Sequence, residues 1–150
     1  MKPYFPMFVN LEDKRILVVG AGTIATRRIK ALMKFGASIR VVAPLFDHEL
    51  EGMEGLDLIN RGFSPGDLED VDIAVIATNN APLNEEIARM CEVRGIIKNV
   101  SSDQTLCDFF FPATIMTDDI IVGICSGGND PSVTKKARSD IEQYLKEKRR

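Results

Sequence analysis

The chain has 150 residues, of which 45% are hydrophobic and 27% are charged, the composition of an ordinary globular domain. Its formal charge of −3 argues against the broad basic surface of a general nucleic-acid binder, so we expect no nucleic-acid partner. No apolar run approaches the ~20 residues that span a bilayer, and the first residues lack the pattern of a secretory signal. We therefore expect a cytoplasmic protein with no membrane partner.

Six apolar runs rich in β-branched residues are predicted to be strands. These runs are Arg15 to Val19, Ile39 to Ala43, Leu56 to Asn60, Asp72 to Ala77, Ile96 to Val100 and Asp119 to Ile124. Polar residues barely alternate with apolar ones in them, which favours a parallel sheet covered on both faces.

Helical patterns lie between several of these runs. From Thr23 to Phe35 apolar residues recur at helical spacing, and Gly36 follows where a helix commonly ends. A second pattern begins with polar capping residues and an early proline at 78–82 and ends at Gly95. This alternation predicts an α/β fold, a Rossmann-like doubly wound parallel sheet followed by a small C-terminal region.

The segment between the first predicted strand and helix, Gly20 to Ala25, has the GxGxxA spacing of a dinucleotide-binding turn. Gly20 would permit the tight turn, Gly22 would let the backbone approach a pyrophosphate, and Ala25 would let helix and strand pack closely. The N-terminus of the helix would favour the negative charge of the ligand.

The second predicted strand lacks the usual marker of an NAD site. Most NAD-binding domains carry an acidic residue at the end of this strand, where it bonds the ribose hydroxyls. Here the strand ends Val41-Val42-Ala43-Pro44, and no arginine follows to receive a 2′-phosphate. The residues alone therefore leave NAD and NADP open.

Cysteine and histidine usage gives no sign of a disulfide framework or a metal site. The three cysteines, Cys91, Cys107 and Cys125, are odd in number and form no CxxC pair. We expect free and mostly buried thiols, because an unpaired cysteine behaves as a small hydrophobe. The one histidine, His48, has no ligand cluster around it, and we expect it in a surface loop rather than on a metal.

Several motifs together resemble the precorrin-2 dehydrogenase and sirohydrochlorin ferrochelatase family, which includes the N-terminal part of bifunctional siroheme synthases. The resemblance covers almost the whole chain. Its motifs are Phe5-Pro6-Met7-Phe8 with Leu11, Val18 to Ala25 with Arg27-Arg28, Gly36-Ala37, Val41 to Pro44, Ala77-Thr78-Asn79, Asn99-Val100, Cys107-Asp108-Phe109, Phe111-Pro112-Ala113, and Ser126-Gly127-Gly128 with Pro131.

The resemblance implies a function: NAD-dependent oxidation of precorrin-2 to sirohydrochlorin in siroheme biosynthesis. It also accounts for the missing acidic residue, because this family has a similar second-strand ending and uses NAD. The candidate cofactor-binding residues are then Gly20, Gly22, Thr23, Ile24, Pro44, Leu45 and Thr78.

The chain divides into two predicted parts, because the sequence changes in character after the predicted sheet. Residues 1–112 would form the NAD-binding Rossmann domain, and residues 113–150 would form a region for dimerisation and substrate binding. The second part is too short to bury a core alone, so we expect a homodimer.

The implied substrate is a tetrapyrrole rich in carboxylates, which calls for cations and hydrogen-bond donors. Candidate cations are Arg27, Arg28, Lys135, Lys136 and Arg138. The loop that starts at Ser126 could face an anion with its backbone amides, and Asp130 would cap the helix that follows. The candidate substrate-binding residues are Ser102, Ser126, Gly127 and Lys135.

Asp103 is the candidate catalytic residue. Bifunctional members carry an aspartate at the position of Ser102, so this sequence departs from their pattern, but Asp103 follows directly. We expect Asp103, in an exposed loop, to take a proton or to balance positive charge on the macrocycle. Asp108 lies beside an aromatic run, where a structural role bonding backbone amides is expected.

Two alternatives stay open. The enzyme could retain ferrochelatase activity, which insertion of iron or cobalt into sirohydrochlorin without NAD would reveal, although the departure at Ser102 disfavours it. The chain could instead be a non-catalytic NAD sensor, which would bind NAD and leave the tetrapyrrole unbound.

Overall fold

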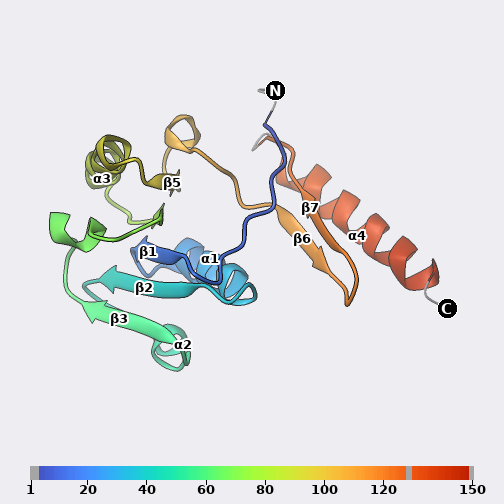
Figure 1. The fold of residues 1–150 in the computed structure, drawn as a ribbon, viewed down its shortest axis with the longest axis horizontal. Helices are drawn as coiled ribbons and strands as arrows, with labels where there is room; N and C mark the ends of the chain where they lie inside the picture. The colour runs from blue at the N-terminus through green and yellow to red at the C-terminus, as the bar shows by residue number, and fades with distance from the viewer. Residues whose placement is uncertain (1–3, 128–129, 149–150) are drawn as a thin grey trace. The chain divides into compact units, whose positions relative to one another are not determined.

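The computed structural model describes residues 4–127 and 130–148. They form two compact units (Figure 1). We call Val9–Phe109 the sheet unit, and the first eight residues together with Phe110–Arg150 the hairpin unit. The sequence did not predict that the first residues group with the C-terminal segment. Within the hairpin unit the ring of Tyr4 lies edge-on to that of Phe110, with ring centroids 4.7 Å apart.

The sheet unit is built on five parallel strands, β1 (Arg15–Val19), β2 (Ser38–Ala43), β3 (Leu56–Asn60), β4 (Ile73–Ile76) and β5 (Ile97–Val100). Their order is β3-β2-β1-β4-β5, so the chain moves outward from β1 in one direction and then returns to its other side. The predicted doubly wound α/β fold is confirmed. Such a reversal creates a crevice at the carboxyl ends of β1 and β4, where ligands of this fold class bind.

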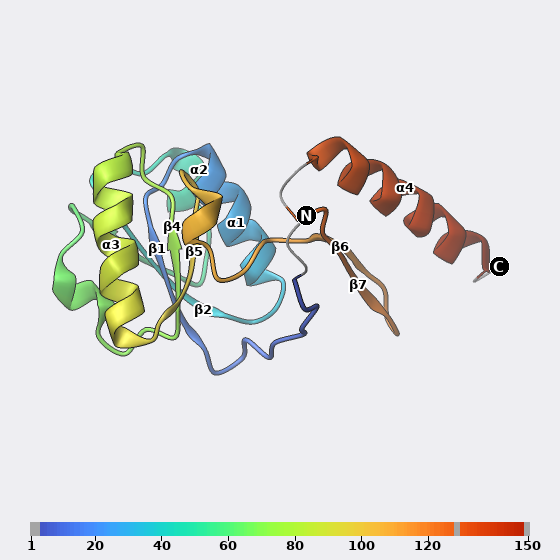
Figure 2. The ribbon, with the colours of Figure 1, turned by 90° about the horizontal axis from the view of Figure 1, so that it is seen from above.

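Two long helices cover the faces of the sheet. Figure 2 shows α1 (Thr23–Met33) and α3 (Ala81–Arg94) on opposite sides of the strands. Leu17 and Val19 of β1 share a buried cluster with Ile87 and Cys91 of α3. Because strand side chains alternate between faces, the neighbouring buried residues Ile16 and Val18 point to the other layer. Burial of both faces explains why the strands read as continuous apolar runs.

The two ends of α3 follow from its sequence. Asn80 caps α3 by accepting a hydrogen bond from the Leu83 amide (3.1 Å between Oδ1 and N). Gly95 ends it with φ of 69°, in the left-handed region. A short helix, α2 (His48–Glu51), and two 3-10 turns, η1 (Pro65–Leu68) and η2 (Gln104–Leu106), complete the unit.

The hairpin unit contains two antiparallel strands and one long helix. Strands β6 (Ala113–Met116) and β7 (Ile121–Ile124) pair, and α4 (Pro131–Lys148) packs along them. Strand β6 was not predicted, because its short apolar run follows directly on the aromatic residues and Pro112. Of the described residues of this unit, only Ile115 is a buried hydrophobic residue.

The cysteines are free, as expected, but only Cys91 is buried, whereas Cys107 is half-buried and Cys125 is exposed. The expectation of mostly buried thiols was therefore wrong, because Cys125 lies in the thin hairpin unit. His48 is fully exposed at the start of α2. None of the helices in the described ranges has the length and apolar character that crossing a membrane requires.

Candidate functional site

The glycine turn after β1 is pressed against the end of β4. Gly20 is buried, has φ of 105°, and donates its N–H to the Val42 carbonyl over 2.9 Å. A Cβ atom at this position would lie 2.4 Å from the Ala77 carbonyl oxygen. Only glycine fits here, which agrees with the predicted role of Gly20 in a tight turn.

Gly22 has the opposite environment, because a Cβ built on it meets no atom within 4 Å. It is the N-cap residue of α1, yet no side chain caps the helix and no acidic residue lies in its first turn. The first N–H groups of α1, including those of Thr23 and Ile24, lack a side-chain cap and carry the positive end of the helix dipole. This open, positively polarised turn can accept a phosphate group.

The end of β2 offers an apolar surface in place of a carboxylate. Leu45 is 82% exposed directly after Pro44. Asn60, the last residue of β3, donates its side-chain N–H to the Pro44 carbonyl over 2.8 Å and so fixes this turn. Leu45 and the exposed Ile24 could each pack against a flat ring system.

The ends of β4 and β5 are joined by one buried side chain of α3. Asn84 is fully buried, and its Nδ2 donates to the Thr78 carbonyl and to Ser102 Oγ, each over 3.1 Å. In return Thr78 Oγ1 donates to Asn84 Oδ1 over 2.5 Å. The arrangement links a candidate cofactor residue to a candidate substrate residue.

Asp103 lies just beyond Ser102 and begins η2. Its Oδ1 accepts hydrogen bonds from the Thr105 amide (2.8 Å) and the Thr105 hydroxyl (2.7 Å). These bonds stabilise the carboxylate and hold the pKa of Asp103 below its ordinary value. Both bonds use Oδ1, and among the described residues no hydrogen bond or ion pair is found at Oδ2, which leaves one carboxylate oxygen as an acceptor.

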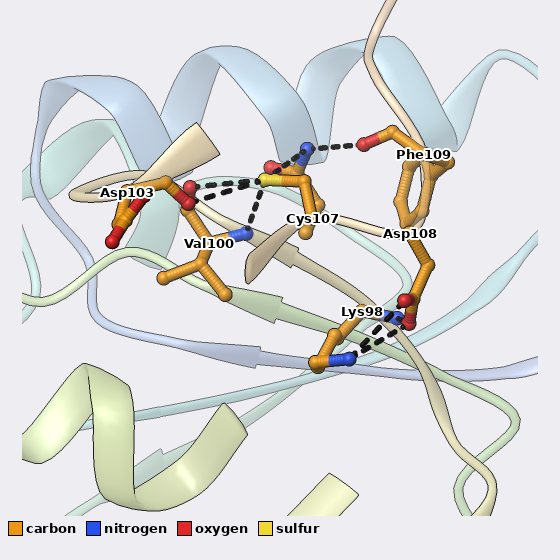
Figure 3. A network of polar contacts seen from close by, with 7 residues as sticks. Lys98, Val100, Asp103, Cys107, Asp108 and Phe109 are labelled. Carbon is orange, nitrogen blue, oxygen red and sulfur yellow. Dashed lines mark hydrogen bonds and ion pairs between the residues drawn. The ribbon is translucent and has the colours of Figure 1, made fainter. Parts of the chain in front are cut away.

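Figure 3 shows how the side chains of Cys107 and Asp108 complete the outer edge of β5. Cys107 Sγ accepts from the Val100 amide over 3.2 Å, and Asp108 accepts from the Lys98 amide over 3.0 Å. The Lys98 ammonium forms an ion pair with Asp108 over 3.1 Å. The structural role expected for Asp108 is therefore confirmed. Burial raises the pKa of the Cys107 thiol.

The candidate residues of the hairpin unit lie in the loop before α4 and on α4 itself. Ser126 Oγ donates to the Asp130 carbonyl over 3.0 Å, and Gly127 has φ of 68°. The Asp130 carboxylate accepts from the Ser132 amide over 2.8 Å, which confirms the predicted cap of α4. Lys135 is exposed on that helix. Gly128, the next residue of the predicted loop, lies outside the described residues.

The remaining candidate cations differ in exposure. Arg27 and Lys136 are exposed, whereas Arg28 is half-buried, and burial lowers its pKa. Arg138 donates to the Thr114 carbonyl over 3.0 Å and pairs with Glu142, which gives it a structural role. No group of three or more potential metal ligands is found among residues 4–127 and 130–148.

Comparison with known proteins identifies the domain that surrounds this site. Residues 7–113 match the family described as putative NAD(P)-binding. The chain belongs to this family. The residues present fit a dinucleotide, because the cradle at Gly20 admits no side chain and the space before Gly22 stays open.

The chain is also similar to named relatives. It is 35% identical over 143 residues to a siroheme synthase of Ectopseudomonas mendocina (strain ymp), and 37% identical over 145 residues to that of Baumannia cicadellinicola. In both cases the match covers 95% of this chain and 31% of the relative. The solved structure of SirC, a precorrin-2 dehydrogenase, matches with a TM-score of 0.77 and 28% identity over 94% of this chain and 71% of that one.

These matches confirm the resemblance to the N-terminal part of siroheme synthase that the motifs indicated. The roles of the individual site residues stay predictions. Sequence reasoning missed Asn84 altogether, although a signal existed. Asn84 continues the stripe of Ile87, Ala88 and Cys91 that α3 buries, and a polar residue in such a stripe needs buried partners.

Proposed function

We propose that this chain is an NAD-dependent dehydrogenase that oxidises precorrin-2 to sirohydrochlorin. The observation that carries the proposal is the turn after β1, where Gly20 is pressed against Ala77 while the space before Gly22 stays open. A pyrophosphate fits such a turn at a helix N-terminus. The names of SirC and of the siroheme synthases supply the substrate class.

We assign the cofactor to the carboxyl edge of the sheet. The amides of Thr23 and Ile24 would bond the pyrophosphate, Pro44 and Leu45 would give an apolar wall, and Thr78 would contact the cofactor from the end of β4. NAD supplies a hydride acceptor when it is bound. The choice of NAD over NADP rests on the family resemblance, because neither a carboxylate nor an arginine ends β2.

The oxidation removes a hydride and a proton from the tetrapyrrole. We propose that Asp103 accepts the proton through Oδ2, the carboxylate oxygen that Thr105 leaves unused. Ser102 would donate a hydrogen bond to the substrate, and Lys135 would pair with one of its carboxylates. Ser126 and Gly127 would contact the substrate only by exchanging bonds, because the Ser126 hydroxyl already donates to the Asp130 carbonyl and the Gly127 amide to Cys125 Sγ.

The proposal is tested by mixing the purified protein with enzymatically generated precorrin-2 and NAD and following the visible spectrum. Sirohydrochlorin absorbance should appear together with NADH, and more slowly when NADP replaces NAD. Absence of both signals, with NAD still bound in a fluorescence titration, would mean that the domain is a sensor. Iron offered with sirohydrochlorin and no NAD tests retained chelatase activity.

We further propose that the protein is a homodimer joined through the hairpin unit. Four apolar side chains of β6, β7 and α4 are between 44% and 58% exposed, namely Met116, Ile121, Val133 and Tyr144. Ile115 alone gives the described part of this unit little core, and a second copy would cover the apolar surface.

The dimer is tested by sedimentation with two matched variants. Val133→Glu puts a charge on α4 and should shift the protein toward monomer. Val93→Glu is the control, because Val93 is 89% exposed on α3 of the sheet unit. A monomeric parent at micromolar concentration would contradict the dimer.

A further inference from the structure

Asn84 is a buried polar residue whose two side-chain donors and acceptor oxygen all have partners at the candidate site. It lies in the first turns of α3 and has no exposed surface. Its two donor bonds go to the Thr78 carbonyl and to Ser102 Oγ, and its acceptor bond comes from Thr78 Oγ1. A buried amide satisfied in this way holds its partners in one geometry, because each lost bond would leave a polar group desolvated.

The partners fix the orientation of the Asn84 amide. The Thr78 carbonyl can only accept a hydrogen bond, so Nδ2 must face it, and a flipped amide would set two oxygens against each other. The same Nδ2 group reaches Ser102, and an amide nitrogen cannot accept. The Ser102 oxygen is therefore the acceptor in this bond.

This assignment decides what the Ser102 hydroxyl can offer to a ligand. Its proton is not used in the bond with Asn84, and no acceptor for it is found among the described residues. Ser102 is exposed at the carboxyl end of β5. It therefore presents an O–H donor at the edge of the sheet where Gly22 and Thr78 also lie.

We propose that Asn84 is a positioning residue for the oxidation, which directs the Ser102 hydroxyl to donate a hydrogen bond to the tetrapyrrole and ties Ser102 to the cofactor side through Thr78. The inference rests on the proposed function. A neutral donor suits a substrate rich in carboxylates, because it bonds an anion without a counter-charge.

The test compares KM for precorrin-2, kcat and the NADH dissociation constant in a double-mutant cycle. Ser102→Ala should raise KM about tenfold, the effect of one lost bond to a charged acceptor, and should leave NADH binding unchanged. Ser102→Thr keeps the hydroxyl and should restore the parent KM. Asn84→Ala should raise KM as much as Ser102→Ala and should also weaken NADH binding, because it frees Thr78.

The double variant separates positioning from independent effects. If Asn84 acts through Ser102, adding Ser102→Ala to Asn84→Ala should raise KM no further. A KM effect that multiplies in the double variant would overturn the proposal, and so would a parent KM in Ser102→Ala. A parent KM in Ser102→Ala would be decisive even if Asn84→Ala does not fold, because the exposed Ser102 can be replaced without disturbing the fold.

Asn80→Ala is the matched control on the same helix. It removes the cap of α3 but leaves the bonds between Asn84, Thr78 and Ser102 in place. It should lower thermal stability without changing KM, so an equal KM rise in this variant would count against positioning. The turnover of precorrin-2 by the parent protein tests the proposed function. The ratios of variant KM to parent KM test the positioning role of Asn84. A failure of the proposed function can therefore be told apart from a failure of the inference about Asn84.

Discussion

Gly20 and Ala77 are in such close contact that the cofactor turn and the end of β4 form one structure. A Cβ atom on Gly20 would lie 2.4 Å from the Ala77 carbonyl oxygen and 2.7 Å from its carbon. The Ala77 amide in turn donates to the Val19 carbonyl over 2.8 Å. The turn thus contributes to the stability of the sheet as well as to the candidate site.

Gly20→Ala should destabilise the protein by about 3 kcal/mol or more. The substitution combines a methyl group inside contact distance with a side chain at positive φ, and each is worth roughly 1–3 kcal/mol. Urea unfolding measures the loss. Gly22→Ala is the control, because open space and a φ of −78° should leave its free energy of unfolding close to that of the parent. Equal stability of the two variants would show that the contact does not constrain the fold.

Gly22→Asp should abolish NAD binding in a folded protein. Aspartate is a favourable N-cap residue, so the start of α1 should not be destabilised, but its charge would occupy the place of the pyrophosphate. Gly22→Asn has nearly the same size and no charge, and it should retain more NADH affinity than Gly22→Asp. Fluorescence titration with NADH and a thermal melt check the two expectations. Unchanged affinity in a folded Gly22→Asp protein would refute the cofactor assignment.

The fold of the sheet unit could be predicted closely because its signals are local. A strand buried on both faces is a continuous apolar run, and β1 and β3 begin and end where the runs placed them. Strand β6 was missed, because four residues in a thin hairpin unit carry no such run and depend on pairing with β7. The grouping of the first eight residues with the hairpin unit likewise arises from tertiary contacts, such as that between Tyr4 and Phe110.

The candidate site was only partly accessible from sequence. The environments of Gly20 and Gly22 could be predicted from motif spacing, because a turn of fixed length sets them. The link made by Asn84 joins residues 18 positions apart, and no local pattern reports that distance. The bonds of Cys107 and Asp108 to β5 are also non-local, since they replace the strand that a wider sheet would place there.

Asp108→Ala should lower the free energy of unfolding by about 1–3 kcal/mol. Lys98 has a side chain only 9% exposed, and the substitution leaves both its ammonium and its amide without their acceptor. Asp108→Asn keeps an acceptor for the Lys98 amide, so its free energy of unfolding should lie between that of the parent and that of Asp108→Ala. Lys98→Met in the Asp108→Ala background removes the unpaired charge and should recover part of the loss. Urea unfolding of the four proteins measures these differences. A free energy of unfolding in Asp108→Ala equal to that of the parent would contradict the prediction.

The chemistry proposed for Asp103 makes a claim about pH. A proton acceptor must be ionised, and the hydrogen bonds from Thr105 hold the pKa of Asp103 below its ordinary value. The required form is therefore present at neutral pH and is lost only as the pH falls through that lowered pKa. The value of kcat should not vary between about pH 5 and 8 on account of this group.

Asp103→Asn should lower kcat by about one to three orders of magnitude while NADH affinity and thermal stability stay close to the parent values. Thr105→Val provides the sharper test, because it removes the hydroxyl bond to Oδ1 and keeps the amide bond. Loss of a donor that stabilises the carboxylate raises the pKa of Asp103 toward its ordinary value, so the acid limb of kcat should move to higher pH while the plateau persists. If Asp108→Asn loses turnover and Asp103→Asn does not, Asp108 is the reacting carboxylate. If neither variant loses turnover, water takes the proton, and the protein contributes by orienting the substrate against the nicotinamide.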